Sequence, residues 1–463
     1  MRGDDEIKEQ PHTMPAVKQK IFRRITMKKI LCILIVICAA FVLVACADEA
    51  PTATPAPAAD ATPAPDAPPG DPPATADQVT TITMSVWDTI PADVSWIVEF
   101  QAANPDIRVE LVDLDAGEYS AIVNTMVLGG TATDVILAWE VDLPRFARMG
   151  VISPMDDLVA NSTLIDANDL MPAVGALAEM TDGLYGLPWV YASHFLFFNK
   201  DMFDAAGIPY PTDDWTWQDM EDAAVALTIR EGGVTTQWGM TDIDFGGIWY
   251  SMIGQAGDDV IDSNLNLAMG SGLRRTLEFM YRLTNELEVV PQPGGAGDVD
   301  LFAAEMAAMR RHGNWNVPGY SDVPFRWDIV PLPGDVRDHS ALHTGMFTIN
   351  AASPHQDEAW RFIEFLMSHQ GQRLLSEFSA NVSSVMSVAA EGHHFVQGVN
   401  GPSNWGAFDA FGNYGRFTFT LLNPAVTGDL VGQFNAVLLG LTTIDDVVNN
   451  QVAAAQTRLD ALD

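Results

Sequence analysis

One stretch decides the fold, Gly183–Phe203, whose sequence is GLYGLPWVYASHFLFFNKDMF. It begins as a glycine-rich turn, continues as an aromatic segment with polar groups inserted, and becomes an uninterrupted apolar run at Phe195–Phe198. A strand that stays apolar on consecutive residues is buried on both faces. The aromatic residues just before it are therefore expected at the edge of a buried sheet, where the chain crosses between two lobes and forms one wall of a ligand site.

Strands and helices alternate along the rest of the chain. Residues 81–87 alternate apolar and polar side chains as a strand does, and residues 118–128 place apolar side chains at helical spacing. Further strands are expected over residues 107–111, 134–139, 327–334 and 344–350, and further helices over residues 93–103, 143–149, 216–228, 273–283, 301–311, 353–367 and 443–459. Thr216, Ser353 and Thr443 are the expected caps of three of these helices. Alternating strands and helices predict an α/β fold with a mostly parallel sheet.

Length and charge limit the possible functions. A chain of 463 residues with 48% hydrophobic content can build two α/β domains with separate cores. Residues 1–46 hold eight of the 24 Lys and Arg residues and four of the 61 Asp and Glu residues, so residues 47–463 keep 16 basic and 57 acidic side chains. Lys200 is the only lysine among them. Because phosphate binding needs clustered Lys and Arg, nucleic acid is excluded as a partner and a strongly anionic ligand is disfavoured.

Motifs for catalysis or metal binding are weak in this sequence. Cys32, Cys38 and Cys46 all lie near the N-terminus, so neither a disulfide framework nor a cysteine zinc site is expected in the body of the protein. No Gly-x-Ser-x-Gly, Walker A or His-Glu-x-x-His pattern occurs. His339 and His343 are four residues apart, but the Pro- and Gly-rich sequence around them disfavours a helical metal-binding pair. No cofactor and no metal are expected.

The N-terminal residues 1–45 are interpreted as a signal peptide whose core is 27–45, with Met1 or Met27 as the start. A 16-residue apolar run follows two lysines, which is shorter than the roughly 20 residues of a membrane-spanning helix. The run ends in Leu-Val-Ala-Cys, a pattern typical of a bacterial lipobox, in which Cys46 would be lipidated. A plain signal peptide, or an N-terminal anchor helix with an incidental cysteine, is the alternative.

Residues 46–78 are interpreted as the lipidated cysteine followed by a linker. The 32 residues after Cys46 include nine Pro, eleven Ala and six acidic residues but no Lys or Arg. Such a composition cannot bury a core and favours extended, polyproline-like conformations. At about 3.1 Å per residue the linker could reach roughly 100 Å, which would tether a globular head outside a membrane.

Four places in the head resemble the extracellular solute-binding proteins of ABC importers, in the family-1 group that includes maltose-binding protein. They are Trp87–Leu111, with its strand, helix and Asn-Pro turn; Asp134–Trp139 followed by Leu143–Pro154; Gly183–Phe203 with the Trp-Thr-Trp sequence at 215–217; and Phe347–Pro354 with its helix. In order and spacing the resemblance covers residues 81–462, nearly the whole head.

The resemblance implies a two-lobe, type II fold like that of the periplasmic binding proteins. Three hinge crossings would join the lobes, with a ligand cleft between them, and the lobes would close on the ligand. Lobe 1 would comprise residues 79–188 and 342–381, and lobe 2 residues 192–334 and 386–463. The resemblance also implies that the commonest ligand class is sugar.

A sugar site needs aromatic platforms for C–H faces and polar groups for hydroxyls. Several candidates follow predicted strands, where ligands of open α/β sheets gather. Another follows a Gly-Asn turn, where the resemblance implies a stacking tryptophan. The candidate ligand-binding residues are Trp87, Asp88, Trp139, Glu140, Trp189, Tyr191, His194, Trp238, Trp249, Asn314 and Trp315. The alternative for each acid is a solvated surface carboxylate, and Trp96, Trp217, Trp327 and Trp360 are expected in cores.

The sequence therefore predicts a lipid-anchored substrate-binding protein that performs no chemistry. Its expected partners are a sugar or oligosaccharide, the transmembrane subunits of an ABC permease, and the membrane through a lipid anchor. It would act as a monomer on the extracytoplasmic face of the cell membrane. A tethered binder of a polyamine or peptide is one alternative, and a surface glycosidase using paired carboxylates is another.

Overall fold

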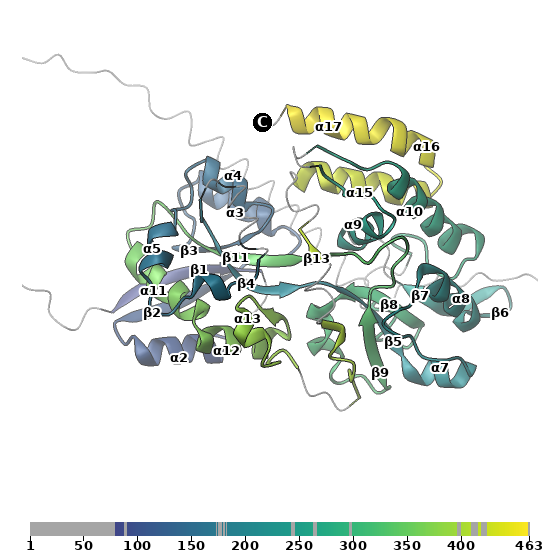
Figure 1. The fold of residues 1–463 in the computed structure, drawn as a ribbon, viewed down its shortest axis with the longest axis horizontal. Coiled ribbons are helices and arrows are strands. Elements are labelled where there is room, and N and C mark those ends of the chain that lie inside the picture. Colours follow the sequence, from purple (N-terminus) through teal and green to yellow (C-terminus); the bar gives the residue numbers. More distant parts are fainter. Residues whose placement is uncertain are drawn as a thin grey trace, which may run out of the picture. The chain divides into compact units, whose positions relative to one another are not determined.

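The computed structural model describes residues 79–87, 90–172, 174, 178, 181, 183–241, 246–262, 266–295, 299–395, 400–408, 415–417 and 424–461. The predicted signal peptide, the lipidation site Cys46, the linker and the site candidate Asp88 lie outside these residues. All of the described residues belong to one compact unit, Thr75–Asp463 (Figure 1). Within them, none of the helices has the length and hydropathy needed to span a lipid bilayer.

A six-stranded sheet, with strand order β12-β4-β11-β3-β1-β2, forms the first half of the fold. Its strands are β1 (Thr80–Val86), β2 (Ile107–Asp113), β3 (Val135–Trp139), β4 (Leu187–Ala192), β11 (His343–Ile349) and β12 (Val382–Ser383). β1 pairs in parallel with β2 and β3, whereas β11 runs antiparallel to β3 and β4. The strands predicted at 81–87, 107–111, 134–139 and 344–350 are confirmed to within one or two residues.

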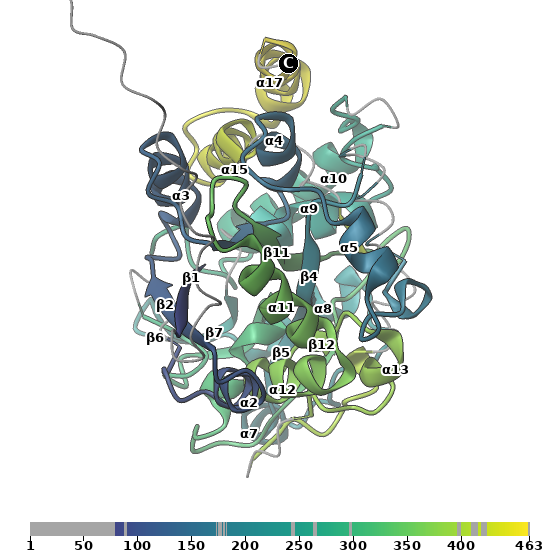
Figure 2. The same cartoon turned by 90° about the vertical axis from the view of Figure 1, so that its left-hand side faces the viewer.

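Helices cover both faces of this sheet (Figure 2). They are α2 (Ser95–Ala103), α3 (Tyr119–Leu128), α4 (Leu143–Arg148), α5 (Asp156–Asn161), η1 (Ala167–Asp169), α11 (Gln356–Met367), α12 (His369–Ser379) and α13 (Met386–Ala389). Alternate β3 residues point to opposite faces, so Leu137 joins the core under α2 and α11, while Ile136 and Ala138 join the core under α3 and α4. Burial on both faces explains why this strand is apolar throughout.

The second sheet has the order β6-β7-β8-β5-β9. Its strands are β5 (His194–Asn199), β6 (Ile229–Glu231), β7 (Val234–Thr241), β8 (Ala307–Gly313) and β9 (Trp327–Pro331). Every residue of β5 is buried, so the doubly covered strand predicted at Phe195–Phe198 is confirmed. Phe197 stacks on Trp327 on one face, while Leu196 and Phe198 lie in the core on the other.

The elements around the second sheet are α7 (Lys200–Ala206), α8 (Trp217–Leu227), α9 (Gly246–Gln255), α10 (Ser271–Tyr281), η2 (Arg282–Glu286), η3 (Asn314–Asn316), η4 (Pro318–Tyr320), α15 (Pro424–Leu438), α16 (Ile444–Asp446), η5 (Val447–Gln451) and α17 (Val452–Asp460). A small pair, β10 (Ser340–Ala341) and β13 (Gly415–Arg416), completes the set. The predicted capping by Thr216 and Thr443 is confirmed, since each hydroxyl accepts a hydrogen bond from the backbone N–H three residues on.

Three predictions are wrong. A mostly parallel sheet was expected, but β11 runs antiparallel to β3 and β4, and β5 runs antiparallel to β8 and β9, so both sheets are mixed. The helix expected over 301–311 is replaced by β8, which lies between β7 and β5 in the middle of the sheet. Its two alanines and Met309 favour a helix in isolation, but helix propensity is a weak prior that tertiary pairing overrides. Ser353 is not the N-cap of α11, whose N-cap is His355. The Ser353 hydroxyl instead donates to Asp134 at 2.6 Å and accepts from the backbone N–H of His355.

The chain passes between the two sheets at several points. Ser193 alone separates β4 from β5, which is the crossing expected within Gly183–Phe203. Residues 332–342 lead back from β9 to β11. Ser387 on α13 still hydrogen-bonds Asp169 beside the first sheet, although lobe 2 was expected to resume at 386. The exact division into lobe segments stays a prediction.

Candidate functional site

A group of aromatic rings lies at the carboxyl ends of β1 and β3 in the first sheet. Trp87 follows β1 and Trp139 ends β3, and their rings stack with centroids 3.9 Å apart and planes 12° from parallel. Trp87 also lies beside Trp189 of β4 at 5.7 Å and meets Tyr119 of α3 edge-on at 5.4 Å. Trp87 and Trp139 are half-buried, whereas Trp189 is buried. We call the pair Trp87 and Trp139 the tryptophan platform.

A glycine makes room for this platform. A Cβ on Gly345 of β11 would lie 2.2 Å from the indole of Trp87, closer than real Cβ contacts come. The position is therefore restricted to glycine by the platform rather than by backbone conformation, since φ is not in the left-handed region there. Sequence patterns gave no sign of this requirement, because the two residues are far apart in the chain.

Two polar side chains lie next to the platform. Glu140 follows Trp139 and is 2% exposed; its Oε1 lies 3.6 Å from Nδ1 of His343, and its Oε2 has no hydrogen-bond partner among the described residues. Tyr191 is 0% exposed, and its hydroxyl has no such partner there either. Burial raises the pKa of Tyr191, and the negative charge of Glu140 raises it further. Both groups can therefore still form hydrogen bonds.

A histidine group lies where the two sheets meet. His194 begins β5 and His343 begins β11, and their rings are edge-to-face with centroids 4.9 Å apart. Trp315 of η3 contacts both, at 5.7 Å and 5.6 Å. Burial lowers the pKa of His194, with His343 and His312 adding to the effect, so this imidazole is neutral at pH 7. Its Nδ1 lies 3.1 Å from the hydroxyl of Ser251 on α9.

Asn314 joins three segments through its amide. Its Oδ1 accepts from the backbone N–H of Ser193 at 2.8 Å, and its Nδ2 donates to Oδ1 of Asn381 at 2.5 Å. The Ser193 hydroxyl in turn bonds that of Ser340 at 2.8 Å. Asn314 is 0% exposed, so the structure places this candidate inside a hydrogen-bond network between chain crossings.

Two candidates lie away from these groups. Trp249 on α9 is 0% exposed and packs against Phe434 in the core of the second sheet. Trp238 pairs with Ala307 at the start of β8, whereas Trp315 follows the end of that strand. At about 3.3 Å per residue, the two ends of β8 are roughly 20 Å apart.

Several neighbours of the candidates were missed by sequence reasoning. His343 was considered only as half of a metal pair, and Tyr119 only as the apolar face of a helix. Both reach the site through sheet pairing or packing between segments far apart in sequence. The strand-end position of His343, opposite Ala192 on β4, is the one signal that could have indicated it.

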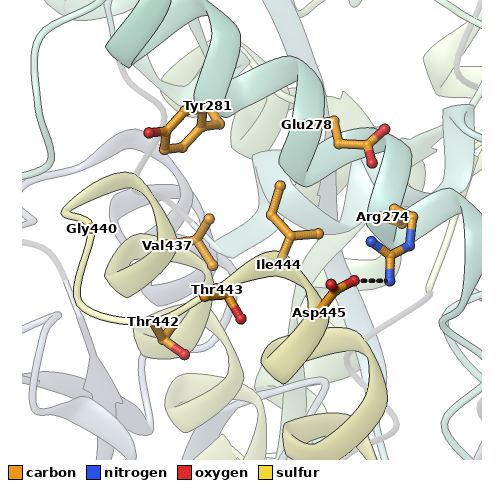
Figure 3. A pocket seen from close by; sticks show the side chains of 9 residues that line it. All are labelled: Arg274, Glu278, Tyr281, Val437, Gly440, Thr442, Thr443, Ile444 and Asp445. Carbon is orange, nitrogen blue, oxygen red and sulfur yellow. Dashed lines mark ion pairs between the residues drawn. The ribbon is translucent and has the colours of Figure 1, made fainter.

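A separate surface pocket of about 340 Å³ lies between α10 and the chain around α16 (Figure 3). Arg274 and Asp445 form an ion pair of 2.8 Å at its rim. None of the predicted ligand-binding residues lines it. In the part of the chain that is described, no group of three or more His, Cys, Asp or Glu side chains is arranged to hold a metal ion.

Comparisons with known proteins agree with this architecture. The chain is similar to an uncharacterized lipoprotein of Streptomyces antibioticus, 24% identical over 64% of this chain and 68% of the relative. Another is an arabinooligosaccharide-binding protein of Halalkalibacterium halodurans, 26% identical over 59% of this chain and 63% of the relative.

The fold matches an ABC substrate-binding protein from Listeria monocytogenes, solved in complex with cycloalternan. The TM-score is 0.76 at 20% identity, covering 83% of this chain and all of that one. The predicted two-lobe α/β fold is thereby confirmed. Residues 87–373 match the family model described as bacterial extracellular solute-binding protein. The chain belongs to the bacterial extracellular solute-binding protein family.

Proposed function

We propose that this protein is the substrate-binding lipoprotein of an ABC importer. It binds a sugar or oligosaccharide between its lobes and delivers it to the permease. Binding shifts the protein from an open to a closed form, because the closed form makes more contacts with the ligand. Trp87, Trp139, Glu140, Tyr191 and Trp315 are the proposed ligand contacts.

The observation that carries this proposal is the tryptophan platform beside Glu140. Indole faces suit the C–H faces of a sugar ring, and the adjacent carboxylate and phenol can bond its hydroxyls. All of these groups lie at one edge of the first sheet, close to the contact between His194 and His343 that joins the two sheets. One of the similar proteins is named as an arabinooligosaccharide-binding protein, and another was solved in complex with cycloalternan.

The protein would act without chemistry of its own, as a monomer on the extracytoplasmic face of the membrane. The family is one of binding proteins, which supports a role in capture rather than catalysis. The lipobox-like sequence ending at Cys46 supports a lipid anchor, as does the name of the Streptomyces antibioticus relative.

Small-angle scattering and thermal melting across a broad glycan panel test the proposal. A sugar that binds between the lobes should reduce the radius of gyration and raise the melting temperature. Trp139→Ala should abolish both responses, whereas Phe378→Ala, which removes a partly exposed ring on α12, should preserve them. No response to any glycan would contradict the proposal, and release of a hydrolysis product would support a glycosidase instead.

A further inference from the structure

We propose that the ligand of this site carries a protonated amine, as an amino sugar or an oligosaccharide containing one, and that Glu140 binds this amine. The inference rests on the proposed function, because it places the amine in the sugar site. It names a chemical class within the sugars rather than a different solute.

The first observation is the burial of an incompletely partnered carboxylate. Glu140 is 2% exposed, and its Oε2 has no hydrogen-bond partner among the described residues. Its Oε1 lies 3.6 Å from Nδ1 of His343, beyond the usual range of a hydrogen bond. A buried ionised carboxylate is costly unless it is paired and hydrogen-bonded. This site therefore favours a ligand that supplies a strong donor.

A neighbouring acid shows what a satisfied carboxylate looks like in this fold. Asp142 lies two residues further on and is also 2% exposed. Its Oδ1 pairs with Arg145 at 2.7 Å, and its Oδ2 accepts from the hydroxyl of Ser120 at 2.5 Å. Two equally buried acids thus differ in their partners: one has an arginine and a hydroxyl, and the other faces a histidine at longer range.

The surrounding chain offers few cations for Glu140. In the ion pairs found among the described residues, its only basic neighbour is His343. Lys200, the only lysine after residue 46, is bonded to Asp328 at 2.6 Å. A positive charge at Glu140 would therefore come from the ligand.

An amine fits these surroundings better than a hydroxyl does. A hydroxyl that donates to the Glu140 carboxylate already makes a charge-assisted hydrogen bond, but an ammonium group also brings a positive charge that pairs with the buried carboxylate. The faces of Trp87 and Trp139 also attract a cation held close to them. The Tyr191 hydroxyl, 0% exposed, can accept a second ammonium hydrogen or bond a neighbouring sugar hydroxyl.

Matched pairs of sugars test this inference by isothermal titration calorimetry on the full-length protein. The pairs are glucosamine and glucose, galactosamine and galactose, and mannosamine and mannose, together with the trisaccharides of glucosamine, N-acetylglucosamine and glucose. The amine should bind about tenfold more tightly than its neutral partner, because it adds an opposite charge to a hydrogen bond that the hydroxyl can also make.

Glu140→Gln should remove that preference, because the amide keeps the shape but loses the charge. Glu118→Gln, at an exposed acid before α3, is the matched control for the loss of one negative charge and should keep the preference. The melting temperature of ligand-free Glu140→Gln should not fall, since the change neutralises a buried charge; this shows that the variant folds.

The outcomes separate the two proposals. Neutral sugars that bind as tightly as their amines overturn the inference and leave the sugar-binding function standing. An amine preference that survives Glu140→Gln overturns the role of Glu140. If no sugar of any kind binds, the proposed function fails, and the inference fails with it.

Discussion

The region around the tryptophan platform, at the carboxyl ends of β1 and β3, differs from the neighbouring crossing at Ser193. The difference lies in how fully their buried polar groups are hydrogen-bonded. Glu140 and Tyr191, next to the tryptophan platform, are buried with hydrogen-bonding capacity left over. Two residues after Tyr191, the backbone and hydroxyl of Ser193 are bonded to Asn314 and Ser340. Buried polar groups are normally satisfied within the protein. The comparison supports our proposal that the first region binds the ligand, whereas the second holds crossings of the chain together.

The largest expected effect is a loss of stability, at a residue that contacts the tryptophan platform and also belongs to the core. Trp189→Ala should lower the free energy of unfolding by about 3–5 kcal/mol, the usual cost of removing a buried tryptophan. Its ring is 6% exposed and packs against Phe347 and Trp96 as well as Trp87. Denaturant melts measure the loss. A variant that melted normally and lost only ligand would move Trp189 from the core to the binding surface.

Removal of the platform should act on binding instead. Trp139→Ala should weaken sugar binding by about 2–4 kcal/mol, as expected for an aromatic anchor. Its ring is half-buried, so stability should change much less than in Trp189→Ala. Titration calorimetry and thermal melting of Trp139→Ala and Trp189→Ala measure the binding and the stability of each variant. Equal loss of stability in the two would show that the platform is only part of the core.

Breaking the hydrogen bonds of Asn314 should lower stability less than Trp189→Ala does. It should also change the balance of open and closed forms. Asn314→Ala should cost about 1–3 kcal/mol of stability, because it leaves the Ser193 N–H and the Asn381 amide without their partner. Scattering should also show an altered balance of open and closed forms in the absence of ligand. Asn285→Ala, on η2 of the second sheet, is a control that should leave this balance unchanged. An unchanged balance in Asn314→Ala would limit Asn314 to a packing role.

The smallest effect, measured per pH unit, concerns the protonation of a buried histidine. Burial lowers the pKa of His339 to about 4, with Arg337 and Arg416 adding to the effect. The unfolded chain, with a pKa near 6.5, takes up the proton first, so this stability is present above about pH 6.5 and is lost as pH falls toward 4. The contribution is about 1 kcal/mol per pH unit in that window. His339→Gln should flatten the measured slope by this amount; an unchanged slope would contradict the burial argument.

The sequence predicted the fold best where local pattern and tertiary environment agree. β5 was recognised because burial on both faces leaves only apolar residues. β8 was missed because its two alanines and Met309 favour a helix, and only pairing with β7 and β5 makes them a strand. Trp249 was a candidate for ligand binding, but it lies on α9, where its ring is in the core.

The candidate site was predictable in part for a similar reason. The position of Trp87 and Trp139 at strand ends is visible in the sequence, since carboxyl ends of parallel strands meet at one edge. Their mutual stacking, the glycine at 345 and the proximity of His343 to Glu140 depend on pairing between segments roughly 50 to 250 residues apart. No local pattern carries that information.

The stacked pair of indoles has an optical consequence. Two parallel rings with centroids 3.9 Å apart couple their electronic transitions, which gives a circular-dichroism band that isolated tryptophans lack. A sugar that inserted between them or turned one of them would change this band. The protein would then report the occupancy of its own site through absorbed light, without any label, among the signals of its twelve tryptophans.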